Sequence, residues 1–297
     1  MLPEADMRIA NALTINVEDY FQAPAFKRSI KAADWPLLTP HIESTIDKIL
    51  QMLSDHDVKA TFFIYSWTAQ RFPALVKLIA QQGHELALRY HYESQQKLQK
   101  SVFVKEVKQG RCLLANLSGD NISGFRSDAQ LFSLENEWLY DELMLANFDY
   151  SSSIITGHKL AEQWQLFDCI DAPRIGLQEL PISSHRVLGR DWDIVNENTL
   201  RVRPYDSTKK LIQHHHDEAQ KPLIASIASW TFDDEQPAIR GDTLLSQWLH
   251  QHKSESMPLL CHQLLAEFSW QTMNALFINK VLSLHTIRNR KRRISSR

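Results

Sequence analysis

The chain has 297 residues, of which 43% are hydrophobic and 23% are charged, and its formal net charge is −2 at pH 7. These proportions are typical of a soluble globular protein, and a charge this close to zero gives no electrostatic reason to expect nucleic-acid binding. Its eight glycines form neither a GxGxxG nor a GxxxxGK pattern, which argues against a glycine-rich nucleotide-binding loop. No stretch approaches the roughly 20 apolar residues of a membrane-spanning helix.

The cysteines and the start of the chain bear on the cellular compartment. Cys112, Cys169 and Cys261 are far apart and odd in number, which favours reducing surroundings over a disulfide framework or a zinc ribbon. The first ten residues lack a charged start followed by an apolar run, so they do not resemble a secretory signal. We therefore predict a cytoplasmic location.

Strand-like and helix-like segments alternate along most of the chain. The segments expected as strands are 13–17, 58–64, 84–88, 124–127, 150–155 and 223–228. The segments expected as helices are 42–53, 73–82, 98–117, 134–146 and 207–219. Repeated strand–helix alternation predicts an α/β protein with a mainly parallel sheet, either open or closed into a barrel. Residues 156–206 are less periodic, and we expect loops and short strands that cover one end of the barrel.

Two adjacent carboxylates, Glu18 and Asp19, follow the first expected strand. The carboxyl end of a strand is where α/β proteins bind ligands, so the pair is a candidate site. The alternative is that Asp19 caps the segment that follows it. Composition and periodicity leave both interpretations open.

Several stretches, in order, resemble the polysaccharide deacetylases of carbohydrate esterase family 4, particularly the branch found in bacterial exopolysaccharide clusters. They are NVEDYFQAPAF (16–26), VKATFFIYSWTAQRFPALVKLIAQQGHELA (58–87), GFRSDAQLFSL (124–134), FDYSSSI (148–154) and SWTFDDEQP (229–237). The resemblance implies a distorted (β/α) barrel. It also implies removal of N-acetyl groups from a sugar polymer, with a divalent metal that activates water.

The domain organisation follows from this resemblance. We expect a deacetylase-like barrel over residues 10–240 and a C-terminal helical extension over 241–285 that packs on it. Residues 286–297, which include TIRNRKRR, are expected to be a basic disordered tail. The alternative for the tail is a basic tether to an acidic polymer or a membrane surface.

In the family, the acidic pair supplies a general base and then a metal ligand, which places these roles on Glu18 and Asp19. Two metal-binding histidines are expected after the GHE-type strand, but Arg89 and Glu93 occupy their positions in GHELALRYHYES. Arginine has no lone pair to donate, so it cannot bind a metal and should instead form an ion pair with Asp19, Glu93 or Glu18. His91 is a possible replacement ligand together with Asp19 and Glu93, and the alternative is an ordinary loop histidine.

Other catalytic positions are also altered. Arg126 occupies the position of the arginine that orients the base, and Ser151 replaces its usual aspartate partner. The position of the catalytic acid histidine is Ala228, which cannot protonate a leaving amine. Tyr20 and Trp230 are candidate substrate-binding aromatics.

The resemblance therefore supports three hypotheses. The first is a catalytically impaired deacetylase-like protein of carbohydrate or exopolysaccharide metabolism, which binds a polysaccharide or a partner of its biosynthesis and needs no cofactor. The second is a divergent hydrolase that removes N-acetyl groups with a zinc-type metal. The third is a non-catalytic interaction protein. None of the three involves nucleic acid or a membrane span.

Overall fold

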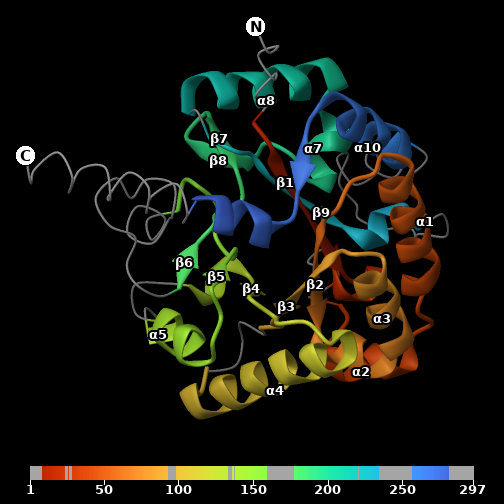
Figure 1. Cartoon of the computed structure of the whole chain (residues 1–297), viewed down its shortest axis with the longest axis vertical. Helices are drawn as coiled ribbons and strands as arrows, with labels where there is room; N and C mark the ends of the chain where they lie inside the picture. Colours follow the sequence, from red (N-terminus) through yellow and green to blue (C-terminus); the bar gives the residue numbers. More distant parts are fainter. Residues whose placement is uncertain are drawn as a thin grey trace, which may run out of the picture.

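A curled sheet of parallel strands lies at the centre of the molecule (Figure 1). The computed structural model describes residues 9–23, 26, 29–92, 98–132, 136, 138–158, 177–219, 221–233 and 256–280. The strands of the sheet are β1 (Asn11–Val17), β2 (Thr61–Tyr65), β3 (Glu85–Arg89), β4 (Gly124–Arg126), β5 (Tyr150–Ser151), β6 (Gln178–Glu179), β9 (Ile224–Ala228) and β10 (Trp270–Gln271). They run in the order β9, β1, β2, β3, β4, β5, β6, and β10 pairs with the first two residues of β1.

The two edges of this sheet approach each other closely. Just after β6, Ser183 N donates a hydrogen bond to Ile224 O of β9 at 3.1 Å, and Ile224 N donates to Ser183 Oγ at 2.9 Å. The sheet is thereby curled almost into a closed barrel. The distorted (β/α) barrel that the sequence predicts is the observed fold.

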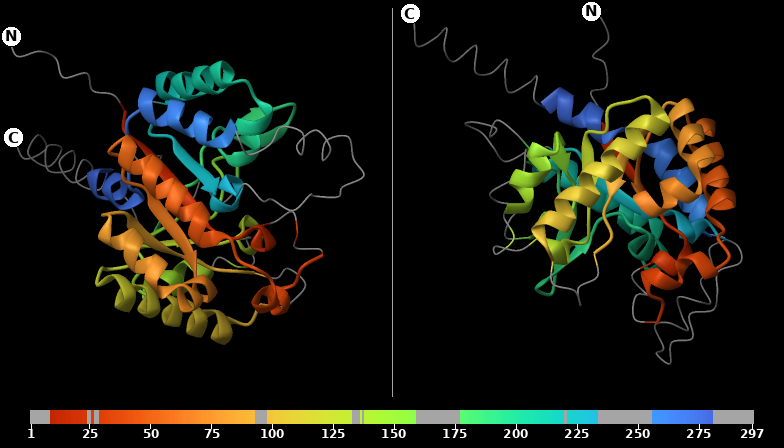
Figure 2. Two further views of the ribbon diagram at one scale, coloured as in Figure 1. Left: turned by 90° about the vertical axis from the view of Figure 1, so that its right-hand side faces the viewer. Right: turned by 90° about the horizontal axis from the view of Figure 1, so that it is seen from below.

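Helices cover the outside of the sheet, as two further views show (Figure 2). They are α1 (Ile42–Asp55), α2 (Ser66–Arg71), α3 (Pro73–Gln81), α4 (Lys100–Ser118), α5 (Trp138–Leu145), α7 (Glu197–Val202), α8 (Tyr205–Ala219) and α10 (Ser256–Glu267). Short 3-10 helices lie at η1 (Tyr20–Gln22), η3 (Ala32–Leu37), η4 (Ala129–Leu131) and η7 (Ser229–Phe232). Among the described residues, no helix combines the length and the apolar character needed to cross a membrane.

The alternation of side chains along the strands separates two environments. In β1, Leu13, Ile15 and Val17 belong to the large core cluster that packs against the helices. The intervening Thr14 and Asn16 instead hydrogen-bond to groups inside the barrel. Because consecutive strand residues point to opposite faces, every second side chain of a barrel strand is available to line the interior. This interior is where the polar site residues lie.

The C-terminal segment contributes directly to the barrel. β10 pairs with β1 through Asn11 and Ala12, and Gln271 Nε2 donates to Ala10 O at 2.9 Å. Residues 273–280 are helical, and the amide of Asn274 donates to the Glu85 carboxylate at 2.8 Å. Eight apolar residues of the expected extension are candidates for docking it on the barrel. Four of them lie in the described part of the chain and pack into the core or against it; these are Leu260, Leu264, Leu265 and Phe268. The others, Leu244, Leu245, Trp248 and Leu249, lie outside the described residues, as does the tail at 286–297.

The expected elements agree closely with the observed ones along the first half of the chain. The helix expected at 73–82 is α3, and Gly83 ends it with a φ of 78°, a conformation that glycine adopts without strain. The strand expected at 84–88 is β3, displaced by one residue. α2, α7 and β10 were not predicted, because the two helices are only six residues long and β10 only two. α10 lies within the C-terminal helical extension that the sequence predicts. The expected domain limits at 240 and 285 remain predictions.

Candidate functional site

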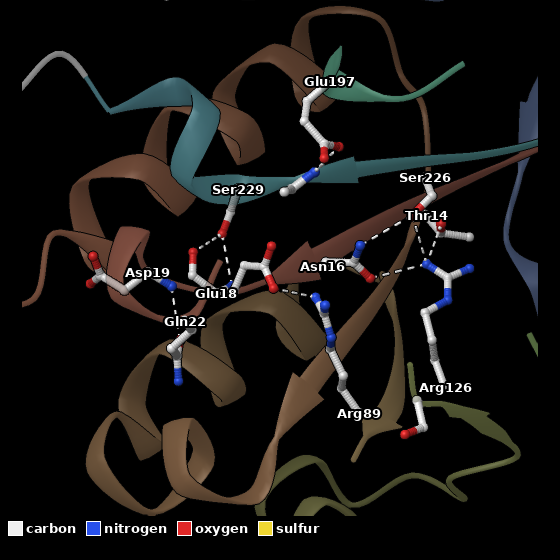
Figure 3. A network of polar contacts seen from close by, with 12 residues as sticks. Thr14, Asn16, Glu18, Asp19, Gln22, Arg89, Arg126, Glu197, Ser226 and Ser229 are labelled. Atoms are coloured by element: carbon white, nitrogen blue, oxygen red, sulfur yellow. Dashed lines mark hydrogen bonds and ion pairs between the residues drawn. The ribbon is translucent and has the colours of Figure 1, made fainter. Parts of the chain in front are cut away.

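A buried ion pair occupies the carboxyl end of the barrel (Figure 3). Glu18 follows β1 and Arg89 ends β3, and Arg89 Nη1 lies 2.6 Å from Glu18 Oε2. The two residues are only 1% and 7% exposed. Burial disfavours the charged form of Arg89, but the negative charge of Glu18 and of weaker neighbours outweighs it and raises the pKa of Arg89. The guanidinium of Arg89 is therefore charged, and it pairs with a strand-end carboxylate in the position where the sequence predicts an ion pair.

The ends of β1 and β9 hold Glu18 in place. Glu18 N donates to Ser229 Oγ at 3.0 Å, and the same hydroxyl donates to Glu18 O at 2.7 Å. On the other side, the guanidinium of Arg89 lies over the ring of Tyr65, 4.8 Å from its centroid. Tyr65 ends β2. Three strand ends and the start of η7 thus fix the geometry of the ion pair.

Asp19 points away from Arg89 (Figure 3) and acts as a helix cap. Its Oδ2 accepts hydrogen bonds from the backbone amides of His41 at 2.7 Å and Ile42 at 3.1 Å, at the start of α1. Its Oδ1 accepts from Tyr20 N at 2.9 Å. Burial raises the pKa of Asp19, while these amides partly counteract that rise. Asp19 is also the N-cap of η1, the segment that directly follows it, so the capping interpretation that the sequence left open is the one that the contacts support.

Arg126, which ends β4, lies deeper inside the barrel than Arg89. Its guanidinium donates to neutral acceptors, which are Thr14 Oγ1, Asn16 Oδ1, Ser226 Oγ, Ser152 Oγ and Ser152 O, at 2.8–3.1 Å. It also lies 3.8 Å from the ring centroid of Phe63. Burial and the nearby charge of Arg89 lower its pKa to about 9, so the guanidinium keeps its charge at neutral pH.

These contacts change the expected role of Arg126. The resemblance assigns it to orienting Glu18, but Asn16 lies between the two residues (Figure 3). In the segment at β5, the serine that contacts Arg126 is Ser152 and not the expected Ser151, whose Oγ lies 2.9 Å from Ser153 Oγ. Arg126 thus links β1, β4, β9 and the residue after β5 in the barrel interior.

His91 lies beside an aromatic cavity on the other side of Arg89. Its ring centroid is 4.8 Å from that of Trp35 and 5.9 Å from that of Tyr65, both in edge-to-face contact. The cavity has a volume of 390 Å³. It is lined by Trp35, Tyr65, Ser66, Trp67, Gln70, Arg89, Tyr90, His91, Glu106, Gln109, Gly110 and Leu113. His91 thus lines a pocket whose wall combines aromatic rings with amide and carboxylate groups.

The metal that the resemblance implies does not fit the described residues. Both oxygens of Asp19 already accept backbone amides, and the positive guanidinium of Arg89 lies against Glu18. A second cation at that position would be repelled at close range. Within the described part of the chain, no three His, Cys, Asp or Glu side chains gather closely enough to hold a metal ion. Glu93, the remaining candidate ligand, lies outside the described residues.

The other expected site residues form a small apolar cluster at the carboxyl end of β9. Ala228 and Trp230 are buried, at 1% and 7% exposure, and pack with Ala23, Tyr20 and Phe26. Ala228 lies at the expected end of the barrel but inside this cluster and not on an open rim. The Tyr20 ring contacts Phe26 with a centroid distance of 6.2 Å.

One residue at this end escaped the sequence analysis. Glu197, in the first turn of α7, is in contact with the end of β9, where Ala228 N donates to its Oε2 at 3.3 Å (Figure 3). Burial raises the pKa of Glu197. The only signal for it is the Asn196 cap before a short helix, which is too weak to identify without the structure.

Two family models and two curated proteins match parts of this sequence. The polysaccharide deacetylase family model matches residues 34–131, and a domain of unknown function, DUF3473, matches residues 157–278. Two curated peptidoglycan-N-acetylglucosamine deacetylases of Bacillus cereus are 35% identical over 81 residues and 36% identical over 73 residues. Those matches cover 27% and 24% of this chain, and they span only 29% and 27% of the relatives' own lengths.

Solved structures share the whole fold at low identity. A Mycobacterium smegmatis protein assigned to the polysaccharide deacetylases superposes with a TM-score of 0.57 at 16% identity, covering 94% of this chain and 92% of that one. Puue allantoinase superposes with a TM-score of 0.56 at 14% identity, covering 92% and 90%. Residues 34–131 are thus similar in sequence to polysaccharide deacetylases, and the chain as a whole shares its fold with these solved structures.

Proposed function

We propose that this chain is a carbohydrate-polymer-binding member of the polysaccharide deacetylase family, with little or no deacetylase activity, that serves in exopolysaccharide metabolism in the cytoplasm. The observation that carries this proposal is the buried Glu18–Arg89 ion pair. It fills the end of the barrel where the resemblance places the general base and the metal.

Three changes act together against catalysis. The carboxylate of Glu18 is bound to a permanent cation, which makes it a poor proton acceptor. Asp19 caps α1, and Ala228 offers no proton to a leaving amine. Loss of positioned acid–base assistance alone typically costs about 100- to 10,000-fold in rate.

The aromatic cavity next to Arg89 supports the binding part of the proposal. Trp67 and Tyr90 supply apolar ring surface in its wall, and Gln70, Gln109 and Glu106 supply groups that hydrogen-bond to hydroxyls or amides. Small-molecule pockets usually combine mostly apolar walls with a few polar groups in this manner. A volume of 390 Å³ lies within the roughly 300–1,000 Å³ range of ligand sites. The curated relatives carry N-acetylglucosamine in their names, so an N-acetylated polymer is the first ligand to test.

The catalytic part is tested by measuring acetate release from acetylated chitooligosaccharides and from acetylated exopolysaccharide, with zinc, cobalt or manganese added. We expect no turnover above the buffer control. Metal-dependent turnover within the roughly 1–1,000 per second of ordinary enzymes, abolished by His91→Ala, would establish the divergent hydrolase instead.

A rescue experiment tests why activity is absent. The triple variant Arg89→His, Glu93→His and Ala228→His removes the competing cation and restores the three histidines that the resemblance expects. We expect zinc binding, measured by calorimetry, to appear in the triple variant and not in the wild type. The variant Arg89→Lys is the control, because it keeps a cation beside Glu18. Zinc binding by the wild type would contradict the proposal.

The binding part is tested separately by calorimetry or affinity electrophoresis with the same oligosaccharides. Trp67→Ala should weaken binding by roughly tenfold, since truncation of a central aromatic typically has an effect of this size. Trp138→Ala, which changes a half-buried tryptophan at the start of α5 that does not line the cavity, is the control. Equal affinity of the Trp67→Ala variant and the wild type would remove this cavity from the proposal.

A further inference from the structure

A two-stranded hairpin in the segment matched by DUF3473 carries an exposed apolar tip. Its strands are β7 (Ser184–Val187) and β8 (Arg190–Asp193), joined by Leu188 and Gly189. Leu188 is 99% exposed, and Val187 and Trp192 are 42% and 47% exposed. An exposed cluster of large apolar side chains typically marks a contact surface.

The backbone makes Leu188 at this tip unexpected. Leu188 and Gly189 have φ angles of 48° and 78°, the left-handed conformation required at both central positions of a type I′ turn. Asparagine followed by glycine is the favoured sequence for this turn. A leucine here is strained and also exposes its whole side chain to water, so neither folding nor solubility explains it.

The two faces of the hairpin differ in charge. The register pairs His185 with Trp192 and Val187 with Arg190, which places these four side chains on one face. Asp191 and Asp193 pair with Arg186 and Ser184, so the carboxylates fall on the opposite face.

The first face borders a groove of 610 Å³, lined by His185, Val187, Leu188, Arg190, Trp192 and Arg203. Arg203 Nη2 lies 3.3 Å from His185 Nε2, and burial together with this neighbouring charge lowers the pKa of His185. The groove residues therefore present apolar side chains and two guanidinium groups with no carboxylate among them.

We propose that this face of the β7–β8 hairpin docks the protein on an anionic phospholipid surface. Leu188 and Val187 would enter the boundary between headgroups and acyl chains, Trp192 would lie at the interface, and Arg190 and Arg203 would contact the phosphates. A small anion would leave the apolar tip unused, and a neutral apolar partner would offer the two guanidinium groups no counter-charge. The interface of an anionic bilayer supplies both environments within a few ångströms.

The test is co-sedimentation of the full chain with vesicles of phosphatidylcholine containing phosphatidylglycerol, and with vesicles of phosphatidylcholine alone. We expect binding only to the anionic vesicles, weakened as salt is raised. Leu188→Asn should reduce partitioning by roughly tenfold, the effect of losing one inserted leucine side chain. This variant is informative because asparagine suits the turn, so the hairpin remains folded. Leu145→Asn, which removes an exposed leucine at the end of α5, is the matched control and should bind as the wild type does.

The charge on the two faces is tested in the same assay. Arg190→Glu should weaken binding to anionic vesicles by roughly tenfold, since each basic residue near the surface typically contributes about a fivefold effect. Arg186→Glu changes the same charge on the opposite face and should have a clearly smaller effect.

Three outcomes would overturn the proposal. One is binding that Leu188→Asn and Arg190→Glu leave unchanged. Another is vesicle binding that only deletion of 286–297 abolishes, which would assign it to the basic tail. The last is absence of vesicle binding together with binding of an anionic polysaccharide that depends on Arg190, which would make the hairpin part of a sugar site.

Discussion

Each end of the barrel holds a glutamate, buried at the carboxyl end and half-buried at the amino end, and the two are stabilised in opposite ways. At the carboxyl end, Glu18 pairs with the cation of Arg89. At the amino end, Glu85 accepts hydrogen bonds from the neutral groups Thr61 Oγ1 and Tyr150 OH, both at 2.6 Å, and from the amide of Asn274. Burial raises the pKa of Glu85 despite these donors.

The difference shows what a buried carboxylate requires in order to serve as a base. Neutral donors and a raised pKa leave Glu85 able to take up a proton, whereas the carboxylate of Glu18 is occupied by the guanidinium of Arg89. The acid with the raised pKa, Glu85, therefore lies at the amino end, away from the candidate site. The carboxyl end is where α/β barrels place their ligand sites, but here the carboxylate of Glu18 is held by Arg89.

The largest expected effect comes from breaking the ion pair. Arg89→Met leaves Glu18 buried without a counter-charge and should lower the free energy of unfolding by about 3–5 kcal/mol, measured by urea denaturation. The double variant Glu18→Leu with Arg89→Met should recover most of that loss, because an apolar pair of similar volume replaces both charges. A double variant as unstable as the single one would show that the cost comes from packing.

A smaller loss is expected at the amino end. Tyr150→Phe removes one partly buried hydrogen bond to Glu85 and should cost about 1–3 kcal/mol in the same measurement. Tyr92→Phe, at a half-buried position in the chain, is the control and should change stability by less than about 0.5 kcal/mol. If the two tyrosine variants are equally stable, Glu85 does not depend on this donor.

Substitutions of Asp19 distinguish its role as a helix cap from a role as a metal ligand. Asp19→Ala should cost about 1–2 kcal/mol, because the first amides of α1 lose their acceptor. Asp19→Asn keeps one oxygen as an acceptor and should cost less. Both losses should be the same with and without added zinc, measured by thermal unfolding. A zinc-dependent difference between wild type and Asp19→Asn would instead indicate a ligand.

The smallest effect concerns pH. The pKa of Glu85 is raised in the folded state above its ordinary value of 4.5, so the folded protein binds more protons than the unfolded chain. The contribution of Glu85 is therefore fully present below pH 4.5 and is lost as pH rises through the folded pKa. Glu85→Gln should remove this loss, by about 1.4 kcal/mol for each unit by which the pKa is raised. Denaturation of both proteins between pH 4 and pH 7 measures it, and parallel stability curves would contradict it.

The fold was predictable from sequence because its signals are local and strong. The apolar face of α1 and the buried strand β2 show the periods of a helix and a strand, and Gly83 marks the end of α3. β10 was not predictable, since its two residues become a strand only by pairing with β1. Tertiary contacts decide such elements, not local preference.

The site was predictable in part for a similar reason. The pairing of Arg89 with a strand-end carboxylate follows from the chemistry of a cation that cannot bind a metal. The choice between Glu18 and Asp19 depends on where the amides of His41 and Ile42 lie, and these are 22 and 23 residues further along the chain. Arg126 was expected beside the base, but its long side chain finds five neutral acceptors deeper in the barrel, which no spacing in the sequence reveals.

The pairing of β10 with β1 has a consequence for folding of the chain during its translation. Ala10 and Gln271, which are hydrogen-bonded, lie 261 positions apart. At roughly 5–20 residues per second, translation needs about 13–50 seconds to cover that distance. During this interval the amino end of β1 has no partner from β10, and the carboxylate of Glu85 has no helix amide to bind. The nascent chain therefore exposes an unpaired strand edge for much of its synthesis, which predicts a dependence on chaperones at that stage and a sensitivity to truncation just before residue 270.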